Sequence, residues 1–190
     1  MKSQIGIDEV GRGAWAGPLL VVALRSNTKM PKGLRDSKLL SKKQREVFAK
    51  EVSKTCDIGE GWVEPFEIDN FGLTEAMRIG VKRALLNIGA TYGEEIIIDG
   101  NVNYCGDKYI HSMAVINADD KHPVVSAASI VAKVQRDNKM NILARSFPQF
   151  GFEANVGYGT RFHINALKQY GVTQIHRKSY KPIKELLDVK

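Results

Sequence analysis

Short runs of apolar residues, several of them closed by an acid or a glycine, recur along this chain and predict the strands of a sheet. Ile5 and Ile7 alternate with other residues near the N-terminus, and residues 19–24 form a continuous apolar run after the break at Gly17 and Pro18. We expect these two strands to pair as a hairpin and the second to be core. Three further strands are predicted over 58–63, 95–98 and 113–116.

Apolar residues at helical spacing predict the helices. Ser41 is a suitable N-cap for a basic helix that extends to about Thr55. Residues 65–72 are expected to form a turn that leads into a helix over 73–88. Residues 124–134 are apolar almost all round and predict a buried helix that continues to 146, with Lys133, Arg136 and Asp137 where it emerges into water.

The last quarter of the chain reads as an ordered loop over 147–158 followed by two helices. Thr160 is expected to cap the first of them, Gly171 to end it, and Pro182 to begin a short basic helix. Together these elements predict an α/β fold. We expect a catalytic domain over residues 1–146 and a C-terminal loop and helical substrate-binding region over 147–190, packed on the same unit.

The chain has 190 residues, a net charge of +7 and a pI near 9.4. This charge favours a polyanionic partner such as nucleic acid. Cys56 and Cys105 lie too far apart in sequence for the paired spacing of a zinc site, and two cysteines make no disulfide framework. No apolar leader or membrane-spanning run is present, so we expect a cytoplasmic protein with no membrane partner.

Carboxylates follow three of the predicted strands. Asp8 and Glu9 end the first, Asp99 ends the strand over 95–98, and Asp119 and Asp120 follow the strand over 113–116. Aspartates that recur at strand ends are the usual way in which an open α/β sheet builds a site, although each alone could be a turn former or a helix cap. Four oxygen ligands are thus available, from Asp8, Glu9, Asp99 and one of Asp119 and Asp120. Without a set of Cys or His they suit Mg²⁺ or Mn²⁺, and in a basic protein they favour two-metal phosphodiester chemistry.

Gly11, Arg12 and Gly13 directly follow the first pair of acids. Two glycines allow the main chain to approach a ligand closely while Arg12 supplies charge, although a solvated surface turn is the alternative. Neighbouring residues of a strand point to opposite faces, so Asp8 and Glu9 can share a site only if the strand stops or twists there.

Several ordered motifs resemble bacterial ribonuclease HII, the type 2 ribonuclease H. They are Asp8-Glu9-Val10-Gly11-Arg12-Gly13, Arg35-Asp36-Ser37-Lys38, Ile98-Asp99-Gly100, Ala118-Asp119 with Ser126-Ala127-Ala128-Ser129-Ile130-Val131-Ala132-Lys133, Gly157-Tyr158-Gly159-Thr160 and His176-Arg177-Lys178-Ser179. The Gly-Arg-Gly version and the missing N-terminal extension distinguish the chain from the related ribonuclease HIII. Tyr180 stands where members often have Phe.

The resemblance implies an RNase H-like mixed sheet flanked by helices, and an endonuclease that acts on RNA/DNA hybrids and on single ribonucleotides embedded in duplex DNA. It implies a two-metal Mg²⁺ or Mn²⁺ mechanism that gives 3′-OH and 5′-phosphate ends. The implied catalytic and metal-binding residues are Asp8, Glu9, Asp99 and Asp119, and the implied substrate-binding residues are Gly11, Arg12, Gly13, Lys38 and Tyr158. Asp119 is chosen over Asp120 by its distance to the Ser126 motif. We expect a monomer, and the chain shows no sliding-clamp binding box.

Two alternatives stay open from the residues alone. One is another metal nuclease or strand-exchange enzyme of RNase H-like fold, which would share the acids but would not need Gly11-Arg12-Gly13 with Tyr158. The other is a non-catalytic nucleic-acid-binding module, which the charge favours but which leaves the strand-end acids unexplained. The four histidines are expected to be caps, surface residues or core partners, because a metal-bound water needs no histidine base.

Overall fold

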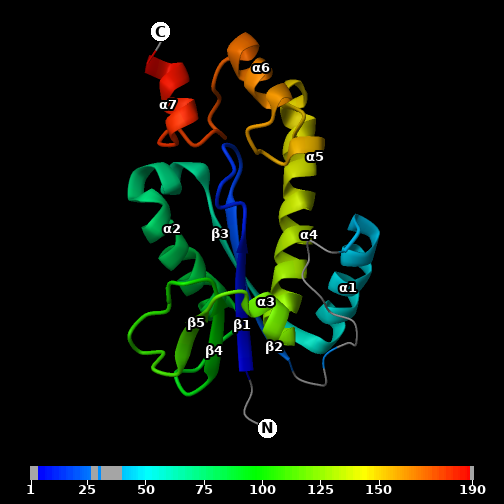
Figure 1. Cartoon of the computed structure of the whole chain (residues 1–190), viewed down its shortest axis with the longest axis vertical. Coiled ribbons are helices and arrows are strands. Elements are labelled where there is room, and N and C mark those ends of the chain that lie inside the picture. The colour runs from blue at the N-terminus through cyan, green and yellow to red at the C-terminus, as the bar shows by residue number, and fades with distance from the viewer. Residues whose placement is uncertain (1–3, 27–29, 31–39, 189–190) are drawn as a thin grey trace. The chain divides into compact units, whose positions relative to one another are not determined.

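The computed structural model describes residues 4–26, 30 and 40–188 (Figure 1). The chain forms two compact units built from interleaved segments. The sheet unit comprises Met1–Val10, Leu20–Trp62 and Met77–Val134, and the helical unit comprises Gly11–Leu19, Val63–Ala76 and Gln135–Lys190. These units interleave along the chain and do not test the domain boundary expected after residue 146, which stays a prediction.

In the described part of the chain, five strands form one mixed sheet in the order β3-β2-β1-β4-β5. They are β1 (Gln4–Val10), β2 (Leu19–Ser26), β3 (Cys56–Val63), β4 (Glu95–Asp99) and β5 (Ser112–Val115). The predicted hairpin is confirmed, since β1 pairs antiparallel with β2. β1 also pairs parallel with β4, which pairs parallel with β5. The apolar run of β2 is fully buried, as its continuous pattern indicates.

The sheet unit packs its core between β2 and parts of two helices. These are α1 (Lys42–Thr55) and α4 (Pro123–Ser146), whose residues up to Val134 belong to this unit. The predicted cap of α1 is present as a capping box, in which Ser41 and Gln44 each accept the other's backbone N–H. Gly6 lets α4 approach β1, because a Cβ there would lie 2.5 Å from the carbonyl carbon of Val124.

The helix α2 (Pro65–Asn87) begins earlier than the sequence predicts. Residues 65–71 were expected to belong to a turn, but they are helical. Gly72, whose φ of 76° and ψ of 163° are not helical, separates them from the helix that the sequence predicts from residue 73. Pro65 suits a first helical position, and the carboxylate of Glu67 accepts the backbone N–H of Glu64. These two features favour the start of a helix at Pro65, although Asp69, Asn70 and Gly72 are residues typical of turns.

The helical unit holds the remaining elements. They are η2 (Pro148–Phe150), α5 (Phe152–Asn155), α6 (Arg161–Tyr170) and α7 (Lys181–Asp188). The loop expected over 147–158 thus contains two short helical turns, because Phe150 and Phe152 are fully buried in the core of this unit. The Thr160 cap and the end of α6 at Gly171 are confirmed.

Candidate active site

Three parallel strands bring their acids to the same edge of the sheet. Gly6 of β1 lies opposite Ile97 of β4, so Asp8 and Asp99, each two residues further along, point to the same face. Ile97 packs in the core cluster that includes Val125 and Ala128 of α4. Asp8 and Asp99 are therefore neighbours on the face that α4 covers.

Asp99 also ties the end of β4 to the short helix α3 (Ala118–Lys121), which carries the third acid. A side-chain oxygen of Asp99 accepts the backbone N–H of Ala118 at 2.7 Å. The next residue, Asp119, is 7% exposed, whereas Asp120 is exposed to solvent. Of the two candidate acids after β5, the buried one is thus Asp119.

Asp8 is under electrostatic strain. It is 7% exposed, and burial raises its pKa well above the ordinary value, with Glu9 and Asp99 raising it further by charge repulsion. A hydrogen bond with the Ser129 side chain and one with the Glu9 backbone N–H, at 2.7 Å, act in the opposite direction. A cation would relieve the strain that repulsion and burial impose on the ionised form.

The strand does not stop between Asp8 and Glu9, so of the two conditions that the sequence argument named, a stop or a twist of the strand, the first is not met. β1 continues through Val10, and Glu9 pairs in register with Val21 while Asp8 pairs with Val22. By alternation Glu9 leaves the sheet on the opposite face. The two carboxylates still interact, as the pKa of Asp8 shows.

The donor set of this edge fits a divalent metal, because all four candidate ligands are carboxylates and the charges of Glu9 and Asp99 raise the pKa of Asp8. Among residues 4–26, 30 and 40–188, however, no group of three or more His, Cys, Asp and Glu side chains is arranged so that it could hold a metal ion as it stands. The assignment of Asp8, Glu9, Asp99 and Asp119 as metal ligands stays a prediction.

The Gly11-Arg12-Gly13 loop belongs to the helical unit, and its two glycines serve different purposes. Gly11 has a φ of 86°, and a Cβ on it would lie 2.0 Å from Nε of Arg136. Gly13 has no such restriction, since a Cβ there would find, among described residues, only Cε1 of Tyr158 at 3.9 Å. Packing inside the protein therefore explains Gly11 but leaves the space over Gly13 open.

Tyr158 lies beside Gly13 within the helical unit, and the substrate-binding role of both residues stays a prediction. The residue is 37% exposed, and the centre of its ring is 5.8 Å from the guanidinium carbon of Arg136. Its carbonyl accepts a hydrogen bond from Nδ1 of His163 at 3.0 Å. Lys38 lies outside the described residues, so its predicted role stays a prediction.

Two buried arginines were not found by sequence reasoning. Arg136, which was expected to emerge into water, is fully buried and donates to the carbonyls of Ala16, Pro18 and Val156 at 2.9–3.3 Å. Burial and the charge of Arg177 lower its pKa to about 10. Arg177 is also fully buried. The polar carbonyls that hold these cations are backbone atoms, which leave no signal in the sequence.

His163 and His176 are core partners, as one of the expected roles for histidine. Their Nε2 atoms are 3.1 Å apart, and both are nearly inaccessible to solvent. Because His163 donates from Nδ1 to a carbonyl, its Nε2 must accept, so His176 donates from its own Nε2. Nδ1 of His176 then accepts the backbone N–H of Thr173 at 3.0 Å. All of these hydrogen bonds can form together only when both imidazole rings are neutral.

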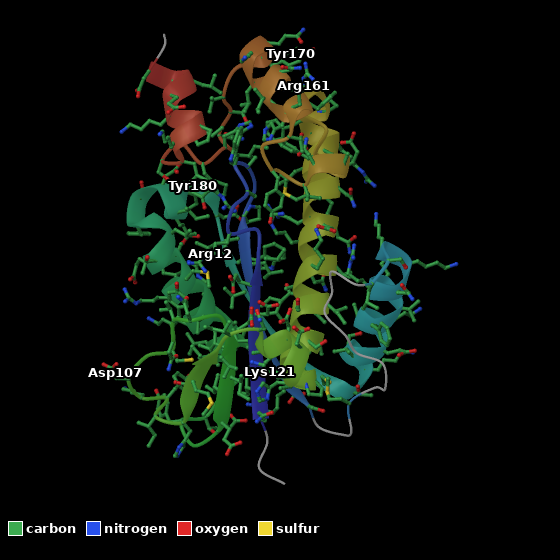
Figure 2. All side chains as sticks on the ribbon, in the orientation of Figure 1. Arg12, Asp107, Lys121, Arg161, Tyr170 and Tyr180 are labelled. Carbon is green, nitrogen blue, oxygen red and sulfur yellow. The ribbon has the colours of Figure 1, made fainter. Side chains whose placement is uncertain are left out.

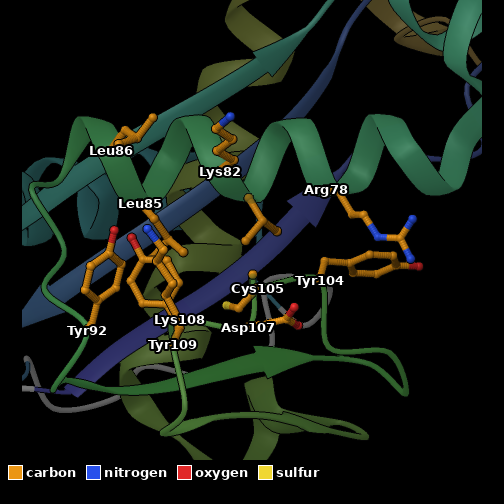
Figure 3. Close-up of a pocket in the computed structure, with 12 residues that line it drawn as sticks. Arg78, Lys82, Leu85, Leu86, Tyr92, Tyr104, Cys105, Asp107, Lys108 and Tyr109 are labelled. Carbon is orange, nitrogen blue, oxygen red and sulfur yellow. The ribbon is translucent and has the colours of Figure 1, made fainter.

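A pocket of about 440 Å³ lies against α2 in the sheet unit (Figure 3). Its lining includes Tyr92, Tyr104 and Tyr109 and the basic side chains of Arg78 and Lys82. None of the predicted site residues lines it.

Within the described residues no helix is long and apolar enough to cross a membrane.

Comparison with known proteins identifies the family of the chain. The sequence model of the family described as Ribonuclease HII matches residues 5–183. The chain belongs to the ribonuclease HII family. A ribonuclease HII from Polynucleobacter asymbioticus is 39% identical over 188 residues, which cover 96% of this chain and 95% of the relative. The predicted family and its enzyme class are confirmed.

Solved structures agree with this membership. The ribonuclease HII of Archaeoglobus fulgidus, solved in a complex with PCNA, superimposes with a TM-score of 0.81 at 27% identity and covers 95% of this chain and 96% of its own. Bst-RNase HIII, solved with Mn²⁺, has a TM-score of 0.73 at 19% identity, covering 99% of this chain and 70% of its own, which shows a shared fold. The predicted RNase H-like mixed sheet is confirmed.

As a ribonuclease HII, the chain is an endoribonuclease that acts on RNA/DNA hybrids. Tyr180, which stands where members often have Phe, makes two hydrogen bonds through its hydroxyl. Its hydroxyl hydrogen-bonds the carbonyl of Arg12, and Arg177 donates to the same hydroxyl (Figure 2 labels Arg12 and Tyr180). A ribonuclease HII with Phe at this position would lack both contacts.

Proposed function

We propose that this ribonuclease HII incises duplex DNA at single embedded ribonucleotides as well as cleaving the RNA strand of hybrids, by two-metal hydrolysis that gives 3′-OH and 5′-phosphate ends. The main support is that Asp8 and Asp99 end neighbouring parallel strands on one face, that Asp99 is hydrogen-bonded to the short helix that carries the buried Asp119, and that the pKa of Asp8 is raised. A polyanionic substrate would not approach such a cluster without cations.

Asp8, Glu9, Asp99 and Asp119 would hold the divalent cations in this proposal. When bound, two such ions activate a water for attack and stabilise the leaving oxygen. The protein's own contribution is to keep these carboxylates in place. Ser129 hydrogen-bonds Asp8, and the Ala118 backbone N–H orients Asp99.

Recognition of the ribonucleotide is assigned to the Gly-Arg-Gly loop and Tyr158. The only group that distinguishes a lone ribonucleotide from its neighbours is one 2′-OH, which both donates and accepts hydrogen bonds. The open space over Gly13 would let backbone groups reach this hydroxyl, while the half-exposed ring of Tyr158 beside it could stack on a neighbouring sugar.

The deciding assay compares three duplexes of one sequence, which contain an RNA strand, a single ribonucleotide or only DNA. We expect cleavage of the first two with Mg²⁺ or Mn²⁺ and none with EDTA, and the upstream product should be extended by a DNA polymerase because it ends in 3′-OH. An uncut single-ribonucleotide duplex, under conditions in which the hybrid is cut, would restrict the function to hybrids.

Replacing Tyr158 tests its part in the recognition. Tyr158→Ala should lower cleavage at the lone ribonucleotide more than cleavage of the hybrid, with the metal dependence unchanged. Tyr170→Ala is a matched control, because Tyr170 is also an exposed tyrosine of the helical unit. Equal losses on both substrates would show that Tyr158 supports the fold or general binding instead.

A further inference from the structure

The carbonyl oxygen of Arg12, at the centre of the Gly-Arg-Gly loop, is held by two side chains from one segment near the C-terminus. Nη1 of Arg177 donates to it at 2.9 Å, and the hydroxyl of Tyr180 donates to it as well. The same Nη1 donates to the Tyr180 hydroxyl oxygen at 2.9 Å. Arg177, Tyr180 and the Arg12 carbonyl thus form a closed triangle, which we call the Arg12 clamp.

The clamp also fixes the far end of the loop. Nε and Nη2 of Arg177 both donate to the carbonyl of Gly17, at 3.1 and 3.0 Å. The backbone N–H of Arg177 donates to the carbonyl of Trp15 at 2.8 Å. One buried guanidinium therefore holds residues on both sides of Gly13, with its planar donors used on backbone acceptors.

The segment that carries the clamp is itself anchored. The carboxylate of Asp69 accepts the backbone N–H groups of Lys178 and Ser179 at 2.9 and 2.8 Å and the Ser179 hydroxyl at 2.7 Å. The Tyr180 N–H closes a turn onto the carbonyl of Arg177 at 3.1 Å. Hydrogen bonds to a charged acceptor are among the stronger ones, so the clamp rests on a fixed base within the helical unit.

Holding the Arg12 carbonyl determines where the next backbone donor points. The described peptide bonds contain no cis bond, and in a planar trans peptide the C=O of one residue and the N–H of the next point in opposite directions. With the Arg12 carbonyl directed at Arg177 and Tyr180, the N–H of Gly13 is directed away from them. Gly13 is also the residue of the loop with open space beside Tyr158.

We propose that Arg177 and Tyr180 are positioning residues that orient the Arg12–Gly13 peptide so that its N–H can meet the ribose of the substrate, and that the Tyr180 hydroxyl sharpens the selection of a ribonucleotide over a deoxyribonucleotide. This inference rests on the proposed role of the Gly-Arg-Gly loop in binding the 2′-OH. Neither side chain is itself required to touch the substrate.

Tyr180→Phe is the informative variant, because it removes one oxygen and keeps the ring that packs 5.2 Å from the Arg177 guanidinium carbon. The measurement is the affinity for a single-ribonucleotide duplex relative to the all-DNA duplex, with Ca²⁺ in place of Mg²⁺ to prevent cleavage. We expect this ratio to fall roughly 3- to 10-fold, which is the loss of about one hydrogen bond's contribution to orientation.

Tyr170→Phe is the matched control, since it removes a tyrosine hydroxyl from an exposed position of the same unit (Figure 2). It should leave the ratio unchanged. Arg177→Lys, with its melting temperature measured in parallel, is the second variant, because lysine cannot hold the Arg12 and Gly17 carbonyls as the forked guanidinium does. It should lower the ratio at least as much as Tyr180→Phe.

The outcomes separate this inference from the function beneath it. If the unchanged protein binds the two duplexes equally, the proposed reading of the 2′-OH has failed. If the unchanged protein discriminates and folded Tyr180→Phe discriminates equally well, the positioning role is overturned while the function stands. A loss of affinity that is the same for both duplexes also overturns it, because a merely structural effect would not change the ratio.

Discussion

The buried pair His163 and His176 should make the helical unit sensitive to acid. Burial, and after it the charge of the neighbouring His163, lower the pKa of His176 from its ordinary value of 6.5 to about 4, against a raising effect of the Thr173 backbone. The pKa of His163 is lowered as well, again by burial. A proton on either ring would set two N–H groups against each other, because each remaining nitrogen is already an acceptor.

The size of the effect follows from linkage. The folded state binds the proton more weakly than the unfolded state, so the neutral ring contributes stability above pH 6.5 that is lost as the pH falls toward 4. A change of the pKa from 6.5 to about 4 corresponds to about 3 kcal/mol once both states are protonated, since one pKa unit is worth about 1.4 kcal/mol. At pH 5.0 the loss from His176 alone is about 2 kcal/mol by the same relation.

Urea unfolding of the metal-free protein at pH 7.5 and pH 5.0 measures this loss. Carboxylates such as Asp8, whose pKa is raised, stabilise the fold as the pH falls, so the comparison must be made against a variant. His176→Gln places an amide nitrogen near the position of Nε2 but cannot titrate. Its free energy of unfolding should be lower than wild type at pH 7.5 and should fall about 2 kcal/mol less between the two pH values.

His111→Gln is the control, because His111 is exposed and its replacement should leave the pH dependence as in the wild type. The reasoning is refuted if wild type and His176→Gln lose the same free energy between pH 7.5 and pH 5.0. That result would mean that the histidine pair accepts a proton without breaking the hydrogen bond between the two rings.

Four further predictions concern the acids, the two glycines of the loop and the charge. Asp8→Asn should reduce cleavage on the order of 100-fold or more, while the metal-free protein melts at the same or a higher temperature, because a buried, repelled carboxylate is removed. As a control, replacement of the exposed Asp120 by Asn should change neither cleavage nor melting temperature. Near-normal turnover of Asp8→Asn would remove this residue from the metal site. Gly11→Ala should destabilise the fold by about 1–3 kcal/mol, since it strains a positive φ and displaces Arg136. Gly13→Ala should fold normally and cleave poorly, and a variant as active as wild type would show that nothing approaches this residue. Hybrid affinity should fall steeply with added NaCl as phosphate contacts release counterions, and an affinity independent of salt would exclude backbone phosphates as the main attraction.

The sequence by itself determined the features that depend on neighbouring residues. Alternating and continuous apolar runs located the five described strands, and Ser41, Thr160 and Gly171 located helix ends, because capping and backbone preferences act within a few residues. The strand-end acids could be found in the same way. The ordered motifs around them were specific enough to indicate the family.

Only the tertiary structure decided which of these local features meet. β1, β4 and β5 place Asp8 and Asp99 on one face because their strands pair in register, a property of residues that lie about 90 positions apart in the sequence. Arg136 looked like a surface residue at a helix exit, yet it is buried, because three backbone carbonyls contributed by distant segments of its own unit accept its hydrogen bonds. Any residue can provide such an acceptor, so the partners of Arg136 and Arg177 depend on the path of the chain and cannot be read from residue types.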